Sequence, residues 1–234
     1  MDVSNLLIFD ESKKYQDEND LCFVGGFPKI PADIDIPTCK LCNSQLTFFF
    51  QVAFPNDHLW SGKSLAMFAC TSCVDRKYFI PEMLKGPLLG IDIPHGFLLS
   101  YQKNFRILVF DTQKGIIRKD YSEKVKFKKW NLKVSALAKK DGNKIGGIPN
   151  WVLDDESPST YNSTTPMIFL MQLKEGFKFD ILPDAPRQMQ LNYFTNNVEP
   201  NNKAYYELFL GNNIYFFGTK DKSNPLVYII TQID

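Results

Sequence analysis

The sequence predicts a mainly β fold, an α+β protein with few short helices, built from two structurally similar halves. Three observations lead to this prediction: short aromatic and β-branched runs separated by Pro, Gly and Asn, a motif that returns 121 residues later, and four cysteines spaced as in a metal knuckle. The halves are expected to come from an internal duplication and to pack about a pseudo-two-fold axis, with a zinc knuckle in the first half.

Six apolar runs are expected to be strands because they combine aromatic or β-branched residues with turn-forming residues at their ends. They are residues 48–54, 64–70, 106–111, 167–173, 214–217 and 226–231. The last two flank residues 218–225, a polar segment with Gly and Pro that is expected to form a hairpin loop. Helical periodicity is weak, and the candidates, 80–84 and 96–104, would be short helices.

The repeated motif is VGGFP at 24–28, which returns as IGGIP at 145–149. The same offset carries Gln51 onto Gln172, and each glutamine ends an apolar run. A glutamine at the end of a buried strand usually ties its amide to neighbouring backbone groups, which is the structural interpretation. The functional interpretation places both glutamines at a possible cleft between the halves, with Trp151, Asp154 and Asp155.

The repeat divides the chain into a first unit, 1–117, and a second unit without a metal site, 145–234, which are expected to form one compact protein. The connecting stretch 118–144 holds ten lysine and arginine residues against three acidic ones, a net charge of +7. It is expected to be a basic linker or an edge strand that its lysines protect from aggregation. The alternative is a surface for an acidic protein or for nucleic acid.

The strongest local signal is the pair of C-x2-C motifs formed by Cys39, Cys42, Cys70 and Cys73. Two such motifs supply four thiolates to a tetrahedral Zn(II) ion, which would close the spacer between them into a loop. Four sulfur ligands leave no position for water or substrate, so the zinc would be structural. Disulfides or free buried thiols are the alternatives. Cys22, in an apolar run, is expected to be a core residue.

Composition narrows the classes of function. The formal net charge of +1 provides no overall field that would attract nucleic acid or an anionic membrane. The first 20 residues lack the pattern of a secretory signal, and no apolar run approaches the roughly 20 residues of a membrane span. We therefore expect a cytoplasmic protein, in which paired C-x2-C motifs indicate a metal site rather than disulfides.

Catalytic motifs are scarce. His58 and His95 are the two histidines, and neither lies in a nucleophile, metalloprotease or phosphate-binding motif. His58, inside the cysteine spacer, is expected either to contact the metal ligands or to be a surface loop residue. The densest acidic cluster, Asp154-Asp155-Glu156, is more typical of a solvated loop than of a catalytic site.

With these motifs in view, the chain resembles the YwqG-like bacterial family of uncharacterised proteins and, more distantly, the programmed-cell-death-2-like zinc-binding chaperones. The first resemblance rests on the G-G-x-P motifs, the apolar strands ending in Gln and the segment GNNIYFFG at 211–218. It implies a duplicated, mainly β fold and no established activity. The second rests on the half that carries the cysteines and implies that Cys39, Cys42, Cys70 and Cys73 bind zinc while the body escorts a client protein.

We therefore expect a cytoplasmic zinc-binding protein that acts as a non-enzymatic protein-interaction or chaperone-like module for a protein partner or client. One alternative is an immunity protein that neutralises a toxin by direct binding. Another is a hydrolase that uses Asp154, Asp155 or Glu156 near Gln51 and Gln172.

Overall fold

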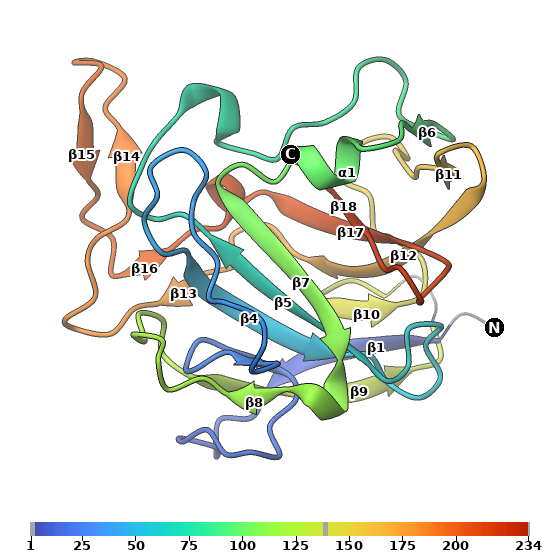
Figure 1. Ribbon diagram of the computed structural model, residues 1–234, viewed down its shortest axis with the longest axis horizontal. Coiled ribbons are helices and arrows are strands. Elements are labelled where there is room, and N and C mark those ends of the chain that lie inside the picture. Colours follow the sequence, from blue (N-terminus) through green and yellow to red (C-terminus); the bar gives the residue numbers. More distant parts are fainter. Residues whose placement is uncertain (1–2, 138–139, 234) are drawn as a thin grey trace.

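A computed structural model describes residues 3–137 and 140–233 and shows a mainly β protein with one large sheet and few short helices, as predicted (Figure 1). Ten strands follow one another in the order β18-β17-β12-β10-β1-β9-β2-β4-β5-β7. Each neighbouring pair along this path is antiparallel, whereas the short strands β6 and β11 at one side pair in parallel. The sheet is therefore mixed.

The strands of the main path are β1 (Ser4–Phe9), β2 (Phe23–Val24), β4 (Thr47–Ala53), β5 (Lys63–Ala69), β7 (Phe105–Asp111), β9 (Lys128–Ser135), β10 (Lys144–Gly146), β12 (Thr165–Leu173), β17 (Asn213–Thr219) and β18 (Val227–Gln232). The short strands outside it are β3 (Lys29–Ile30), β6 (Asp92–Ile93), β8 (Ile116–Ile117), β11 (Thr160–Tyr161), β13 (Phe179–Asp180), β14 (Met189–Leu191), β15 (Val198–Pro200) and β16 (Tyr205–Tyr206). The six predicted strands correspond to β4, β5, β7, β12, β17 and β18.

The helices in the described part of the chain are short: α1 (Phe97–Ser100) and the 3-10 helices η1 (Arg76–Tyr78), η2 (Thr112–Lys114) and η3 (Phe209–Gly211). The predicted helix at 96–104 is reduced to α1. The predicted helix at 80–84 is wrong, because this segment is irregular and the backbone N–H of Leu84 donates to the hydroxyl of Tyr228 at 3.2 Å.

The strands from β9 to β7 are called the first side of the sheet, and those from β1 to β18 the second side. These two sides repeat the same local geometry. In the first side Phe23 of β2 pairs with Gln51 of β4, and in the second Lys144 of β10 pairs with Gln172 of β12. The offset of 121 residues found in the sequence relates the first pair to the second, residue by residue. The irregularity between Phe48 and Phe50 in β4 also returns, between Phe169 and Met171 in β12. The G-G-x-P motifs therefore follow equivalent strands, β2 and β10, and lie between the two strands of each pair.

The basic stretch 118–144 contains a central strand, so the alternative of an edge strand does not hold. Strand β9 pairs with β1 on one side and with β2 on the other. Strand β1, from the predicted first unit, pairs with β9 and with β10 of the second unit. The two expected halves therefore share one continuous sheet. Lys139 of the basic stretch lies outside the described residues.

The sheet curves around an apolar core to which both of its sides contribute. Phe50 of β4 packs edge-on against Phe216 of β17, with ring centroids 5.9 Å apart. A second cluster lies on the other face of β4 and β5, where Phe48 and Phe68 pack with Tyr121 and Cys39. Strand β4 is buried along its whole length because both of its faces are covered, which explains its unbroken apolar sequence.

The two terminal strands of the path, β7 and β18, are capped by consecutive residues that follow α1. The hydroxyl of Tyr101 donates to the carbonyl of Val227 in β18 at 2.7 Å. The side-chain oxygen of Gln102 accepts from the N–H of Ile107 in β7 at 2.8 Å. One short segment thus occupies hydrogen-bonding groups on both strands, which opposes pairing with other chains there.

Candidate metal centre and adjoining cavity

The four cysteines meet because β4 and β5 are antiparallel neighbours. Thr47 at the start of β4 pairs with Ala69 at the end of β5. Cys39 and Cys42 lie in the loop that leads into β4, and Cys70 and Cys73 lie directly after β5. The 27-residue spacer between Cys42 and Cys70 contains both strands, so it returns the chain to the same end of the sheet. Sequence spacing and sheet topology therefore agree.

Backbone hydrogen bonds hold both loops. The N–H of Cys39 donates to the carbonyl of Ser44 at 2.8 Å, and the N–H of Asn43 donates to the carbonyl of Cys39 at 2.9 Å. Asn43 adopts the left-handed conformation, with φ of 61°, that closes this turn. In the second loop the N–H of Cys70 donates to the carbonyl of Asn104 at 2.7 Å, which ties it to the start of β7.

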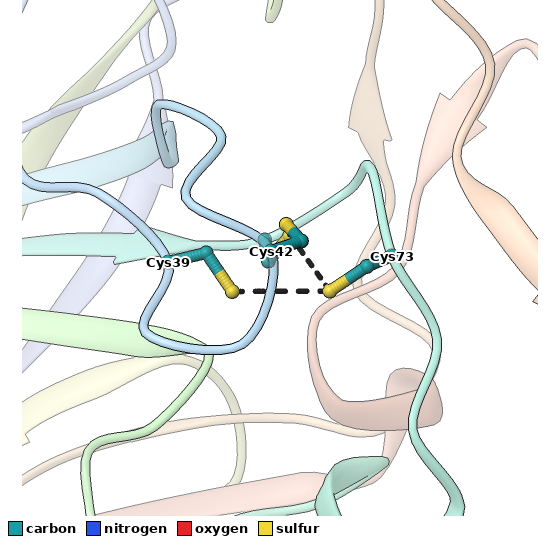
Figure 2. A group of neighbouring side chains, drawn as sticks. Cys39, Cys42 and Cys73 are labelled. Atoms are coloured by element: carbon teal, nitrogen blue, oxygen red, sulfur yellow. Dashed lines mark hydrogen bonds between the residues drawn. The ribbon is translucent and has the colours of Figure 1, made fainter.

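The sulfur atoms are arranged as a compact group whose members all lie within 4.8 Å of one another. The Sγ atoms of Cys39 and Cys73, which point toward each other in Figure 2, are 3.8 Å apart. Those of Cys42 and Cys70 are 3.7 Å apart, and those of Cys70 and Cys73 are 3.4 Å apart. Tetrahedral Zn–S bonds of about 2.3 Å place sulfurs about 3.8 Å apart, so the donor set could hold a metal such as zinc.

The thiols differ in acidity. Burial raises the pKa of Cys70 to about 11 and raises that of Cys73 further. Burial also acts to raise the pKa of Cys42, but hydrogen bonds with the side chain and backbone of Ser44 outweigh it and lower this pKa to about 7. On their own, the buried thiols therefore favour the protonated form, and a divalent cation is the group that would hold all four as thiolates.

Basic side chains surround the cysteine cluster. Lys40 lies between the first two cysteines, and its pKa is lowered by burial and then by the neighbouring charges of Arg106 and Lys103. Burial also lowers the pKa of Lys124, while the charge of a Cys70 thiolate opposes this shift. Four thiolates around a divalent cation carry a net charge of −2, which these side chains would offset.

The residues of the possible cleft are not gathered in one site within the part of the chain that the structure describes. Gln51 and Gln172 are buried on β4 and β12, with β2, β9, β1 and β10 between them in the sheet. Trp151 packs on Tyr215, with ring centroids 4.2 Å apart. Asp154 and Asp155 are exposed, and a carboxylate oxygen of Asp155 accepts from the backbone N–H of Ser157 at 2.8 Å.

Both glutamines make the backbone contacts of the structural interpretation. The side-chain oxygen of Gln51 accepts from the N–H of Lys29 at 3.1 Å, and that of Gln172 accepts from the N–H of Asn150 at 2.9 Å. Lys29 and Asn150 are again 121 residues apart. Gln172 also donates to the carbonyl of Gly142 at 3.0 Å.

His58 and Cys22 lie away from the cysteine cluster. His58 is in the turn between β4 and β5, at the opposite end of these strands, where its ring stacks on Phe54 and its Nδ1 accepts from the N–H of Trp60 at 3.0 Å. It is therefore not a partner of the metal ligands. Cys22 is a buried core residue, as expected, and its Sγ accepts from the N–H of Ala53 at 3.3 Å.

A cavity of about 230 Å³ adjoins the cysteine cluster and was not predicted from the sequence. One wall is formed by Cys70, Cys73, Val74, Asp75, Tyr78 and Phe79. The opposite wall comes from β14 and from the segment around η3. The N–H of Met189 in β14 donates to the carbonyl of Thr71 at 2.9 Å and joins the two walls. Strand β14 lines this cavity. The hairpin that it forms with β15 projects from the rest of the molecule (Figure 1).

Comparison with known proteins gives no assignment: no protein-family profile matches the chain, and neither a curated protein nor a solved structure matches it significantly. Among the described residues, no helix has both the length and the apolar character needed to span a lipid bilayer.

Proposed function

We propose that Cys39, Cys42, Cys70 and Cys73 bind one structural Zn(II) ion. The observation that carries this proposal is the compact group of four sulfurs at the ends of two paired strands. All four positions of a tetrahedral ion would be filled by protein ligands, so the metal would link the 39–46 loop to the 70–79 loop rather than activate water or substrate.

Elemental analysis of the protein, purified without chelator, tests this proposal. We expect about one zinc ion per chain and its loss in the Cys39→Ser/Cys42→Ser variant. Cys22→Ala is the matched control, because this buried cysteine lies outside the cluster and its loss should leave the zinc content unchanged. A wild-type protein without bound metal, still folded, would contradict the proposal.

We further propose that the two sides of the sheet arose by internal duplication and are related by a pseudo-two-fold axis. Support comes from the matched pairs Phe23↔Gln51 and Lys144↔Gln172. It also comes from the strand order, which is symmetric about the central pair of β1 and β9. The axis would pass through the central pair Ile8↔Asn131 of β1 and β9. A kinship with the YwqG-like family and, through the cysteine-bearing half, with the programmed-cell-death-2-like chaperones is part of this proposal.

The function we propose is that of a cytoplasmic, non-enzymatic protein-interaction or chaperone-like module. The support is an apolar surface beside the cavity, formed by Tyr193, Phe194 and Leu210, residues that are 72%, 101% and 55% exposed. Large apolar groups that gather at a cavity are typical of binding surfaces rather than of scattered surface residues. The loop that carries Cys70 and Cys73 forms one wall of this cavity, which would give the zinc ion a role in shaping the surface.

Photo-crosslinking in cells tests this function. A photoreactive residue at Phe194 should yield discrete protein adducts, and these should be lost when Cys39→Ser/Cys42→Ser is added. The matched control is the same photoreactive residue at Tyr15, which is 84% exposed and lies outside the residues that line the cavity. Equal adducts from both positions would contradict a specific interaction surface.

A further inference from the structure

The size and lining of the cavity beside the cysteine cluster restrict what it can hold. Its lining includes apolar groups from both walls, among them Phe49, Ala69, Leu208 and Phe209. The volume of about 230 Å³ exceeds the roughly 150 Å³ that holds a benzene molecule in an apolar protein cavity. It is smaller than the roughly 300–1,000 Å³ of pockets for drug-sized ligands. One large apolar side chain and its adjoining peptide unit would fit this space.

Two side-chain amides in the lining have an unpaired hydrogen-bonding atom. Asn201 is 6% exposed, and its Oδ1 accepts from the N–H of Lys203 at 3.1 Å, which leaves its Nδ2 without a partner among the described residues. Asn104 donates from Nδ2 to the carbonyl of Tyr78 at 2.8 Å, and its Oδ1 is likewise unpaired within 3–137 and 140–233. In both cases the bond that is made fixes which atom is oxygen and which is nitrogen.

The Asn201 side chain is largely buried, but its Nδ2 is not among the fully buried atoms without a partner, so this donor stays accessible to an occupant of the cavity. The cavity therefore offers one N–H donor, from Asn201, and one oxygen acceptor, from Asn104. A peptide group has the complementary pair, a carbonyl oxygen and an N–H. Two other polar groups of this wall are already engaged: both ends of the Gln188 amide bond the backbone of Glu207, and Lys203 pairs with the Glu207 carboxylate.

The rim of the cavity extends the apolar surface beyond the volume of one side chain. Tyr193 and Leu210 belong to the lining and are largely exposed, and Phe194 follows Tyr193 at the tip of the hairpin. Phe209 and Leu210 both adopt the left-handed conformation, with φ of 49° and 63°, which is strained for side chains of this size. An occupant that contacts this rim as well as the cavity must be longer than the cavity itself.

We propose that this cavity binds an extended segment of a partner protein, with one apolar side chain inserted and the adjoining peptide group hydrogen-bonded by Asn201 and Asn104. The proposal rests on the protein-interaction function proposed above and names the chemistry of the partner: an uncharged, leucine-like or phenylalanine-like residue in an extended chain. The carbonyl of that segment accepts from Asn201 Nδ2, and one of its N–H groups donates to Asn104 Oδ1.

Blocked single amino acids provide the test, with binding followed by amide chemical shifts of the full-length, zinc-loaded protein. N-acetyl-leucinamide or N-acetyl-phenylalaninamide should shift the side-chain amide signal of Asn201 and the signals of the cavity lining. N-acetylglycinamide, which lacks the apolar side chain, should bind at least tenfold more weakly. The methyl ester of N-acetyl-leucine lacks the terminal N–H groups and should also bind more weakly than the amide.

The variant Asn201→Asp replaces the unpaired donor with an acceptor and keeps the oxygen that bonds the N–H of Lys203. We expect it to weaken binding of N-acetyl-leucinamide at least tenfold. The matched control is Asn202→Asp, which adds the same charge at the neighbouring, exposed position and should leave binding unchanged. If Asn201→Asp does not fold, intermolecular NOEs from the leucine methyl groups to Phe209 in the wild-type protein replace this comparison.

Three results would overturn the proposal: equal binding of the glycine and leucine amides, wild-type affinity in Asn201→Asp, or shifts confined to residues outside the cavity. None of these would affect the zinc content or the adducts formed at Phe194. The failure of this inference is therefore distinguishable from a failure of the proposed function, in which those two measurements themselves are negative.

Discussion

Trp60 and Gly218 are in direct contact across the two sides of the sheet. The indole of Trp60, in the turn between β4 and β5, is fully buried, and its Nε1 donates to the carbonyl of Thr219 at 2.9 Å. A Cβ atom on Gly218 would lie 2.4 Å from Cζ2 of Trp60 and 2.7 Å from Cδ1 of Leu170. The turn between β4 and β5 is therefore packed against β17, and Trp60 leaves room only for glycine at position 218.

We predict that Gly218→Ala destabilises the protein by about 1–3 kcal/mol, the usual cost of forcing a methyl group into a packed core. Urea denaturation followed by tryptophan fluorescence would measure this. A double-mutant cycle with Trp60→Leu provides the control, because the smaller side chain removes the clash. The two changes should then be less destabilising together than the sum of their separate effects. Strict additivity would show that the contact does not limit position 218.

The equivalent glutamines Gln51 and Gln172 allow a second prediction. Replacing either by leucine leaves the N–H of Lys29 or Asn150 without its acceptor, and we expect a loss of about 1–3 kcal/mol in the free energy of unfolding. The loss should be larger for Gln172→Leu, since this side chain also donates to Gly142. Chemical denaturation measures both.

The control for the glutamine variants is Gln113→Leu, on the exposed side of η2, which should change stability by no more than about 0.5 kcal/mol. If all three variants behaved alike, the hydrogen bonds from the Gln51 and Gln172 side chains to the residues that follow the G-G-x-P motifs would not contribute to stability.

Most of the strands that could be predicted from the sequence are buried on both faces, whereas β7 was predicted although it is only partly buried. β4 and β17 are buried at every position, so their sequences are unbroken apolar runs that stand out from their surroundings. Of the central pair of the sheet, β1 was missed, and β9 was anticipated only as a possible edge strand in the basic stretch 118–144. In β9 Asn131, Lys133 and Val134 are exposed, so its sequence has the polarity of a surface segment although both of its edges are paired.

The candidate metal site was predictable because its ligands are local in sequence and their chemistry is specific. The cavity beside it was not, because its walls come from residues around Cys73 and around Met189, more than 100 positions apart. Its unpaired amides become evident only once the partners of Asn104 and Asn201 are known. The repeat at an offset of 121 residues was visible in the sequence. The pairing of β1 with β10 of the other unit was not.

His58 gives a pH dependence of stability. Burial lowers its pKa from 6.5 to about 4. As the pH falls below 6.5 the unfolded chain binds a proton that the folded protein does not, so the folded state loses stability between pH 6.5 and 4. We expect this residue to account for about 2–3 kcal/mol of the difference between pH 7.5 and 4.5.

The variant His58→Gln isolates this contribution from that of the carboxyl groups, which titrate in both proteins. Urea denaturation at the two pH values should show a smaller loss of stability on acidification in the variant than in the wild type. His95 offers the matched control, since His95→Gln should keep the wild-type dependence on pH. An identical loss in all three proteins would assign the acid sensitivity to other groups.

Removal of the metal should affect both stability and binding, since Cys70 and Cys73 are part of the cavity wall as well as of the sulfur cluster. A ligand present at about 1,000 times its dissociation constant stabilises a protein by about 4 kcal/mol. For a chain of this size, chelation should therefore lower the melting temperature on the order of 10 °C.

N-acetyl-leucinamide should bind more weakly to the metal-depleted protein and recover its affinity when zinc is restored. The Cys22→Ala protein should respond to chelation in the same way as the wild type. Unchanged affinity after complete depletion would mean that the 70–79 loop keeps its shape without the ion, and that the metal and the cavity are independent.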